Sequence, residues 1–246
     1  MTRRRWIADE VSGNHAALLD AHADHLIRVL RARVGQDFDI ATGAVVRRGR
    51  ITSLANDRVE FELAEEISSS GLPQITLLLA IFKFDRMEWA IEKCTELGVS
   101  RIIPVIARRT DAHLASSSTK RVERWQRIAR QASEQSRRAA PPEIAAPIKL
   151  SESLSFSESM RVVLAESEDQ TSLRDVLASH AAGDAAKAGE QFVLAIGPEG
   201  GWTEDELAAF QRAGWISASL GDTILRAETA AIAATALVAS ALQRFV

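Results

Sequence analysis

The stretch VLAIGPEGGWTEDEL (193–207) decides the fold, because an apolar run passes through a proline and three glycines into the start of a helix. A short, continuous apolar run that ends at turn residues is typical of a strand buried on both faces of a sheet. Thr203 and Glu206 have the spacing of a capping box, which fixes the first turn of a helix. The stretch therefore predicts a strand, a glycine loop and a helix in succession, as in parallel α/β sheets.

Other apolar runs of similar length and β-branched character occur along the chain. They are ITLLLAIF (75–82), RIIPVIA (101–107), RVVLAES (161–167) and WISASLG (215–221). A helix face lies between the first two of these runs, with Gly98 as its stop, and it consists of Met87, Ala90, Ile91, Cys94 and Leu97. Strands that are apolar on both sides and alternate with helices predict a parallel sheet covered by helices on both faces.

The N-terminal part of the chain has a different pattern. DFDIATG (37–43), VVRRGRITSL (45–54) and RVEFELAEEI (58–67) predict strands. HLIRVLRARVG (25–35) predicts a short helix or helical turn that ends at Gly35. In the last predicted strand the apolar residues Val59, Phe61 and Leu63 alternate with charged ones, as in a strand half buried against a core. Short strands separated by turns predict a small barrel-like β domain over residues 1–70.

Two segments predict loops. SSSGLPQ (68–74) combines Ser, Gly and Pro, which resist both helix and sheet, so it predicts the linker to a second domain over residues 74–246. AAGDAAKAGE (181–190) predicts a loose surface excursion inside that second domain.

The composition bounds the class of protein. The chain of 246 residues is 46% hydrophobic and 26% charged, and its net charge of −3 excludes a uniformly basic nucleic-acid binder. Cys94 is the only cysteine, so an internal disulfide is excluded and a reducing, cytoplasmic setting is expected. The five histidines are scattered and predict no metal site. No apolar stretch has the length of a signal peptide or of a membrane span, so no membrane partner is expected.

The glycine loop is a candidate ligand site. Ligands of parallel α/β sheets bind beyond the carboxyl ends of the strands, where residues 197–202 are expected. Gly200 and Gly201 expose backbone amides that no Cβ shields, so the loop is either a main-chain cradle or a tight turn without a ligand. The chain contains neither the phosphate-loop pattern nor the dinucleotide fingerprint Gly-x-Gly-x-x-Gly.

A second glycine-bearing junction follows the last predicted strand, in SLGDTILRAETAAIAATAL (219–237). Gly221 ends the strand, and Arg226 and Glu228 stand just before a helix rich in small residues. By itself this junction fits a salt-bridged helix entry. Two glycine loops that leave neighbouring strands favour a pocket between them.

Four ordered motifs in the second domain resemble one family. They are FKFDRMEWAIEKCTELGV (82–99), RQASEQSRR (130–138) followed by two prolines and Ile144, IGPEGGWTEDE (196–206) and LGDTILRAETA (220–230). Together they resemble the bacterial 16S ribosomal RNA uridine-N3 methyltransferases, which belong to the SPOUT class of S-adenosylmethionine-dependent enzymes. RRRWIADE (3–10) and HADHLIRVLRARVG (22–35) resemble the PUA-like RNA-binding domain of the same family.

The resemblance implies a fold and a function. The fold is α/β, with a SPOUT-type trefoil-knotted parallel-sheet methyltransferase domain preceded by a small PUA-like β-barrel, and the protein is expected to form a homodimer. The expected activity is methylation of N3 of a specific uridine in 16S ribosomal RNA, free or in the small ribosomal subunit, with S-adenosylmethionine as cofactor. The alternatives are another RNA target or atom, and a non-catalytic RNA-binding factor in ribosome assembly.

The family's motifs also carry over its site residues. The residues expected to bind the cofactor are Leu194, Gly197, Pro198, Glu199, Gly200, Gly201, Leu220, Gly221, Ile224, Leu225 and Thr229. Glu199 has the alternative role of fixing its loop by accepting backbone amides. We hypothesise that Arg226 stabilises the developing uridine anion or its phosphate, and that Glu228 orients Arg226 or accepts the proton.

Clustered basic residues predict an RNA surface despite the acidic net charge. Segment 120–138 is rich in arginine, and further cations follow predicted strands, Arg108 and Arg109 among them. The residues expected to contact RNA are Arg5, Arg28, Arg31, Lys83, Arg86, Arg130, Arg137 and Arg138. Phe84 and Thr223 depart from the family's usual residues and bear on how RNA is positioned. The alanine-rich last helix (228–245) fits an ordinary core helix, and the resemblance favours a dimer interface.

Overall fold

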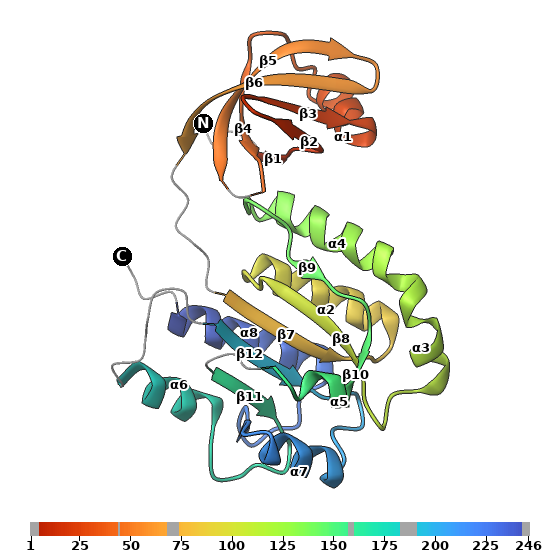
Figure 1. Cartoon of the computed structure of the whole chain (residues 1–246), viewed down its shortest axis with the longest axis vertical. Coiled ribbons are helices and arrows are strands. Elements are labelled where there is room, and N and C mark those ends of the chain that lie inside the picture. Colours follow the sequence, from red (N-terminus) through yellow and green to blue (C-terminus); the bar gives the residue numbers. More distant parts are fainter. Residues whose placement is uncertain (1–4, 44, 68–73, 157–159, 183–190, 243–246) are drawn as a thin grey trace. The chain divides into compact units, whose positions relative to one another are not determined.

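The computed structural model divides the chain into two compact units (Figure 1). The first unit comprises residues 1–71 and 133–141, and the second comprises residues 72–132 and 142–246. Residues 133–141, which the sequence placed in the second domain, thus belong to the first unit. The residues described are 5–43, 45–67, 74–156, 160–182 and 191–242. Most of the predicted linker and of the predicted 181–190 loop lies outside them.

The first unit contains a mixed sheet. Its described strands are β1 (Arg5–Ile7), β2 (Glu10–Ser12), β3 (His15–Leu19), β4 (Asp37–Ala41), β5 (Val46–Ala55) and β6 (Arg58–Ile67), in the order β1-β4-β5-β6-β3-β2. Only the β1–β4 pairing is parallel among these strands. The strands predicted from residue 37 onward are confirmed. β1 to β3 were not predicted, because they are short and mix apolar with polar residues.

The helical part of the first unit differs from the prediction. Helix α1 (Asp20–Asp24) continues as a π-helical turn, η1 (His25–Val29), and stops before Arg31. Arg31 has a φ of 51°, in the left-handed region that a helix cannot contain. The predicted helix over 25–35 is therefore too long at its C-terminal end.

The core of the first unit forms as the alternation predicted. Val59, Phe61 and Leu63 are buried and pack with Leu18 and Leu26. The segment 133–141 contributes to this unit, because Ala139 packs against a small buried cluster of Ile7, Ala41 and Val46. A polar contact adds to it: His22 Nε2 lies 3.4 Å from Glu134 Oε1.

The second unit contains a parallel sheet. Its described strands are β7 (Gln74–Ala80), β8 (Arg101–Ile106), β9 (Glu143–Ile144), β10 (Ile148–Lys149), β11 (Met160–Leu164), β12 (Gln191–Ile196) and β13 (Ile216–Ala218). Their order is β10-β8-β7-β12-β11-β13, with β9 also paired to β8. Every pairing among them is parallel, as the apolar runs predicted.

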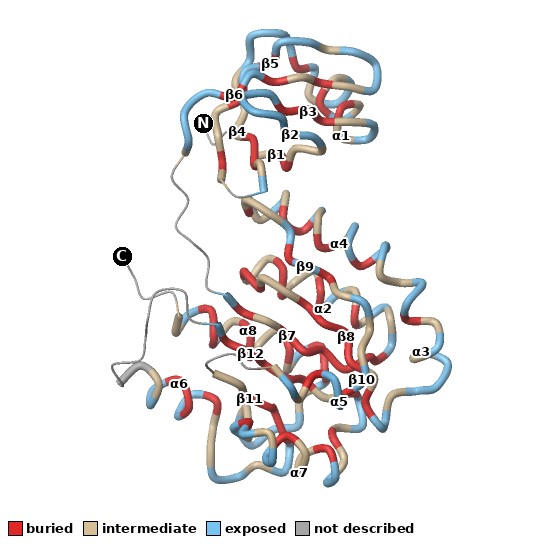
Figure 2. The backbone as a smooth tube through the Cα atoms, in the orientation of Figure 1, coloured by how far each residue is buried: buried red, intermediate tan, exposed pale blue. Residues whose placement is uncertain are grey.

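Helices cover both faces of this sheet. They are α2 (Phe84–Glu96), α3 (Ala112–Ser117), η2 (Ser118–Arg121), α4 (Val122–Gln135), α5 (Leu150–Ser153), α6 (Leu173–Ala182), α7 (Glu204–Arg212) and α8 (Ala227–Leu242). Residues of α2, α4, α6 and α8 form one core cluster with the sheet, and residues of α5 and α7 form the other (Figure 1). Along β7, Leu77 and Leu79 belong to the first cluster, whereas Leu78 and Ala80 belong to the second. Figure 2 shows buried residues along the central strands of this sheet.

Most of the predicted face of α2 is buried as expected, at Met87, Ala90, Ile91 and Cys94, whereas Leu97 caps the helix and is only half-buried. Burial raises the pKa of the Cys94 thiol to about 12, and Thr235 Oγ1 donates to its sulfur at 3.5 Å. This thiol stays protonated and is a core group rather than a nucleophile. No described helix combines the length and the apolar character that crossing a bilayer requires.

Candidate functional site

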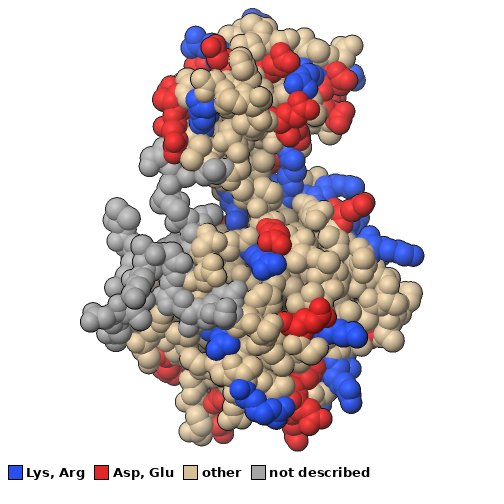
Figure 3. Space-filling model, viewed as in Figure 1, with Lys and Arg blue, Asp and Glu red and all other residues tan. Residues whose placement is uncertain are grey.

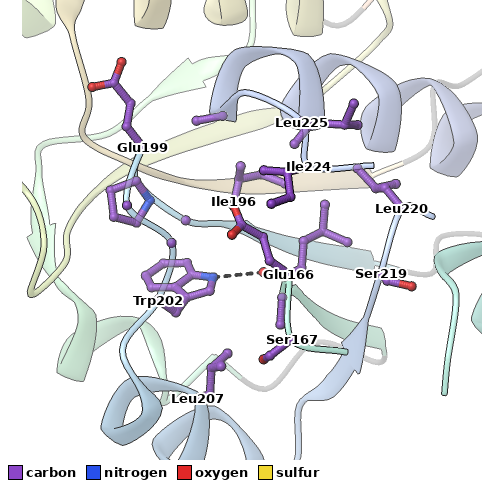
Figure 4. Close-up of a pocket in the computed structure, with 18 of the residues that line it drawn as sticks. Glu166, Ser167, Ile196, Glu199, Trp202, Leu207, Ser219, Leu220, Ile224 and Leu225 are labelled. Atoms are coloured by element: carbon purple, nitrogen blue, oxygen red, sulfur yellow. Dashed lines mark hydrogen bonds between the residues drawn. The ribbon is translucent and has the colours of Figure 1, made fainter. Parts of the chain in front are cut away.

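Three loops of the second unit surround a cavity of about 350 Å³ at the carboxyl ends of neighbouring strands. The first loop follows β11 (residues 165–167), the second follows β12 (197–202) and the third follows β13 (219–225). Figure 4 shows side chains from all three loops around this cavity. The two glycine loops therefore form one pocket, as predicted. The strands that they follow are not neighbours as expected, because β11 lies between β12 and β13 and adds its own loop to the pocket.

The loop after β12 is fixed at its helical end by a capping box. Thr203 N donates to Glu206 Oε2 at 2.8 Å, and Glu206 N donates to Thr203 Oγ1 at 3.3 Å. The other carboxylate oxygen of the buried Glu206 accepts from the backbone N–H of Arg108 at 2.7 Å. Within the loop, Gly201 N donates to Pro198 O at 2.8 Å, and Gly201 has a φ of 68°, which favours glycine.

The glycines of this loop also make room for protein side chains. A Cβ on Gly197 would lie 3.3 Å from the Trp202 indole, and a Cβ on Gly200 would lie 3.3 Å from Cδ of Arg109. The sequence analysis explained these glycines by the close approach of a ligand. The structure adds a second reason, since Trp202 and Arg109 occupy the space next to them. Gly221, with a φ of 121°, has open space where its Cβ would be.

Trp202 joins two of the loops. Its indole Nε1 donates to Leu164 O, at the end of β11, at 3.1 Å (Figure 4). Its ring packs edge-on against Phe210, with 5.1 Å between the ring centroids. The buried tryptophan thus holds the loop after β12 against the strand that carries the first loop.

The cavity lining combines apolar and acidic side chains. Its apolar side chains include Ile196, Leu220, Ile224 and Leu225, and Ile224 is 81% exposed. Its charged lining residues are Glu166, Glu199, Glu204 and Asp222 with Arg109. Such a lining suits a ligand with a flat apolar part and a positive charge or several hydroxyl groups.

The structure brings most of the predicted cofactor residues together at the cavity. Those that line it are Gly197, Pro198, Glu199, Gly200, Gly201, Leu220, Gly221, Ile224 and Leu225. Leu194 does not, because it lies inside β12 and faces the core cluster of α2 and α8. Thr229 does not either, because it lies on the side of α8 that borders a groove with Trp89 and Lys93.

Sequence reasoning missed the loop after β11 and one side chain after β8. Glu166 and Ser167 line the cavity from the first, and Arg109 lines it from the second. Arg109 was assigned to RNA. The sequence did contain a signal for Glu166, because a carboxylate directly follows an apolar run that predicts a strand.

The hypothesised partnership of Arg226 and Glu228 is not present. Glu228 has a side chain only 4% exposed, and its Oε1 lies 3.8 Å from Nε of Arg86. Arg86 also donates to Glu199 Oε1 at 2.7 Å. Arg86 takes this position because α2 packs along α8. Arg226 is exposed and forms no ion pair with any described residue.

The predicted RNA contacts differ in how far they are exposed. The exposed ones are Arg28, Arg31, Lys83 and Arg137, and the half-buried ones are Arg5 and Arg130. Arg28 forms an ion pair with Asp24, with 2.5 Å between Nε and Oδ1. The Arg5 guanidinium donates to the carbonyl of Arg137. Arg138 is only 8% exposed and donates to Ala140 O at 3.2 Å, so it is not a surface cation. Burial lowers its pKa to about 10.

The arginine-rich helix is partly neutralised. On α4, Arg124 donates to both carboxylate oxygens of Glu88, at 2.6 and 2.7 Å. Figure 3 shows acidic and basic side chains interspersed on the viewed face of the second unit. Phe84, one of the two departures from the family, packs edge-on against Trp125, and the Arg121 guanidinium lies 4.6 Å from its ring centroid. Phe84 therefore stabilises the contact between α2 and α4.

The other departure, Thr223, is exposed and lines the cavity. Among the described residues, no group of three or more His, Cys, Asp or Glu side chains is arranged to hold a metal ion.

A ligand-sized cavity bounded by loops at the carboxyl ends of parallel strands defines a ligand-binding α/β protein. Within that class, residues 70–239 match the RNA methyltransferase domain family, and the chain belongs to this family.

Curated relatives extend the match to most of the chain. The ribosomal RNA small subunit methyltransferase E of Synechocystis is 34% identical over 231 residues, which cover 92% of this chain and 73% of the relative. The protein of the same name from Rickettsia conorii is 31% identical, and the match covers 89% of this chain and 86% of the relative.

Solved structures agree in fold. The ribosomal RNA small subunit methyltransferase E of Neisseria gonorrhoeae, crystallised bound to S-adenosylmethionine, superposes with a TM-score of 0.80 at 32% identity, covering 97% of this chain and 98% of that one. A putative methyltransferase of Legionella pneumophila, also bound to that cofactor, superposes with a TM-score of 0.82 at 27% identity, covering 98% of each chain.

Proposed function

We propose that this protein transfers a methyl group from S-adenosylmethionine to N3 of one uridine in small-subunit ribosomal RNA. The observation that carries the proposal is the cavity built by the loops after β11, β12 and β13. Family membership and the relatives named for small-subunit ribosomal RNA support the RNA substrate. Because the proposed substrate is ribosomal RNA, the proposal places the protein in the cytoplasm.

The residues present fit this cofactor. The cavity volume of about 350 Å³ is near the lower end of the range of small-molecule sites, roughly 300–1000 Å³. Ile224 and Leu225 offer apolar surface for an adenine ring, and the lining carboxylates suit ribose hydroxyls and positive charge. When bound, the cofactor supplies a methyl group already activated by its sulfonium.

The protein's own residues must then prepare the uridine. N3 of uridine attacks well only after losing its proton, so a cation near the base lowers the barrier. Arg226 directly follows the cavity-lining Leu225 and is exposed, so we assign it to the developing anion or to a neighbouring phosphate. Glu228 acts through Arg86, which joins it to Glu199 of the cofactor loop.

Glu228 Oε2 is buried and has no hydrogen-bond partner among the described residues. A buried carboxylate oxygen without a donor is costly, so a donor is expected to reach it in the functional complex. We assign that donor to the substrate base or to a water that carries its proton.

The larger assembly is also part of the proposal. We infer a trefoil knot in the second unit, because its sequence motifs resemble the SPOUT class. We infer a homodimer through the exposed side of α2 and α8, where Trp89 is 48% exposed. The first unit is assigned to RNA as a PUA-like barrel domain, with the exposed Arg28 and Arg31 on its surface.

Mass mapping of methylated nucleosides tests the proposed function. Ribosomal RNA from a strain lacking the gene is expected to lose one N3-methyluridine of the small-subunit RNA. The native gene is expected to restore it, and a gene carrying Arg226→Ala to restore little, because the anion is then unsupported. Loss of a different methylated nucleoside would assign another target, and an unchanged pattern would favour a non-catalytic assembly factor.

A further inference from the structure

We propose that Arg109 is a positioning residue that holds the loop after β12 in its cofactor-binding shape, and that residue 200 is a glycine in order to admit the Arg109 side chain. The inference rests on the proposed function of the same cavity and names a residue that acts on it through the loop. Arg109 was expected to face RNA, and its contacts assign it a different task.

Two hydrogen bonds connect Arg109 to the loop. Its Nη1 donates to Gly200 O at 2.5 Å and to Trp202 O at 3.2 Å, across more than ninety residues of sequence. Both acceptors are main-chain carbonyls, so the interaction holds the backbone path and not a side chain. Hydrogen bonds from a guanidinium are stronger than those between neutral groups.

The turn that carries Arg109 is itself fixed. Thr110 Oγ1 accepts from Ala107 N at 3.0 Å, and Thr110 N donates to Ala107 O at 3.1 Å. The backbone N–H of Arg108 donates to Glu206 at the start of α7. The turn after β8 is therefore joined to the C-terminal half of the glycine loop through the Arg109 guanidinium, and to the helix that follows it through Glu206.

The geometry of Gly200 points to the same pair. Gly200 is not among the glycines of positive φ, so its backbone does not demand glycine. A Cβ there would lie 3.3 Å from Cδ of Arg109 and 3.8 Å from its Cβ. Only the arginine side chain crowds that position, so glycine at 200 and arginine at 109 form one structural unit.

The loop needs such a restraint because glycine has more conformational freedom than any other residue. Ordering Gly197, Gly200 and Gly201 at the moment of binding would weaken affinity, and a loop ordered in advance avoids that cost. Arg109 is exposed, so its contacts contribute little to global stability. Its loss should therefore appear in cofactor affinity and in loop dynamics, not in the melting temperature.

The first test compares Arg109→Ala with Arg108→Ala by calorimetric titration of S-adenosylmethionine into the full chain. The two variants lose the same charge at adjacent exposed positions, but only Arg109 contacts the loop through its side chain. Arg109→Ala is expected to weaken binding about tenfold, the effect of losing charge-assisted hydrogen bonds. Arg108→Ala is expected to bind as the native protein does, and Arg109→Lys to recover only part of the affinity.

A double-mutant cycle with Gly200→Ala tests the pairing of the two residues. In the native background the alanine methyl group presses on Cδ of Arg109 and shifts that side chain away from its two carbonyl acceptors, so Gly200→Ala should weaken binding. In the Arg109→Ala background the crowding atom is gone, so Gly200→Ala should have no further effect. Additive losses would overturn the pairing, and equal affinity of Arg109→Ala and Arg108→Ala would overturn the role of Arg109.

Amide hydrogen exchange in the ligand-free protein separates this inference from the proposed function. Peptides covering residues 196–207 should exchange faster in Arg109→Ala than in Arg108→Ala. Faster exchange in Arg109→Ala supports the restraint of the loop by Arg109, whether or not the native protein binds S-adenosylmethionine. Failure of the native protein to bind S-adenosylmethionine would reject the proposed function instead. Unchanged exchange would reject the restraint.

Discussion

Glu166 presents a carboxylate to the cofactor cavity without a partner of its own. Its side chain is exposed and forms no hydrogen bond or ion pair with any described residue. A Cβ on Gly201 would lie 3.8 Å from its Oε2, so the carboxylate borders the glycine loop. Glu199, by contrast, is already paired with Arg86. At the residue scale, Glu166 is therefore a lining acid that can interact with charge on a ligand.

The substitution Glu166→Gln tests this. S-adenosylmethionine carries a sulfonium that the demethylated product lacks, so a free carboxylate favours the substrate over the product. Calorimetry is expected to show weaker binding of S-adenosylmethionine, by about threefold to fivefold as for an exposed charge pair, and unchanged binding of S-adenosylhomocysteine. Asp205→Asn, on α7 and outside the cavity lining, is the control. Equal losses for both ligands would assign Glu166 to the shared ribose instead.

The exposed side of α2 and α8 is the feature that matters most at the scale of elements. A groove between these helices is lined by Trp89, Leu97, Thr229 and Ile232, and Leu237 further along α8 is 38% exposed. An exposed tryptophan beside small helix residues is typical of a surface that another chain covers. Ala231 and Ala234 are buried, as the core interpretation of the alanine-rich helix predicts, and a dimer interface along the same helix stays a prediction.

The substitution Trp89→Glu is expected to convert the proposed dimer into a monomer, because it replaces the largest exposed apolar side chain of this face with a charged one. Sedimentation velocity at micromolar concentration measures the change. Val11→Glu is the matched control, since Val11 is 47% exposed on the first unit. A native protein that sediments as a monomer, or a Trp89→Glu variant that remains a dimer, would contradict the assignment of this face.

Elements with strong local signals were predictable from the sequence. The long apolar runs and the helix face at Met87–Cys94 follow from periodicity, and the start of α7 follows from the capping box of Thr203 and Glu206. β9 and β10 were not predictable, because two residues carry no period. The helix over 25–35 was overextended, because nothing in its composition reveals the positive φ of Arg31.

At the scale of the whole molecule, long-range contacts limit what a sequence reveals. The glycine loops were recognisable as motifs, whereas Arg109 and Arg86 meet the loop after β12 across 91 and 113 residues. The segment 133–141 joins the first unit for the same reason, through tertiary packing that no local pattern records. Charge counts alone misplace a residue such as Arg138, which is buried.

Diffraction from crystals of the protein soaked with S-adenosylmethionine tests the cofactor cavity most directly. The donor is predicted to occupy the cavity, in contact with loops 197–202 and 219–225, with Arg109 still bonded to the carbonyls of Gly200 and Trp202. A saturating soak in which the cavity stays empty, or in which the donor binds elsewhere on the chain, would contradict the proposed function.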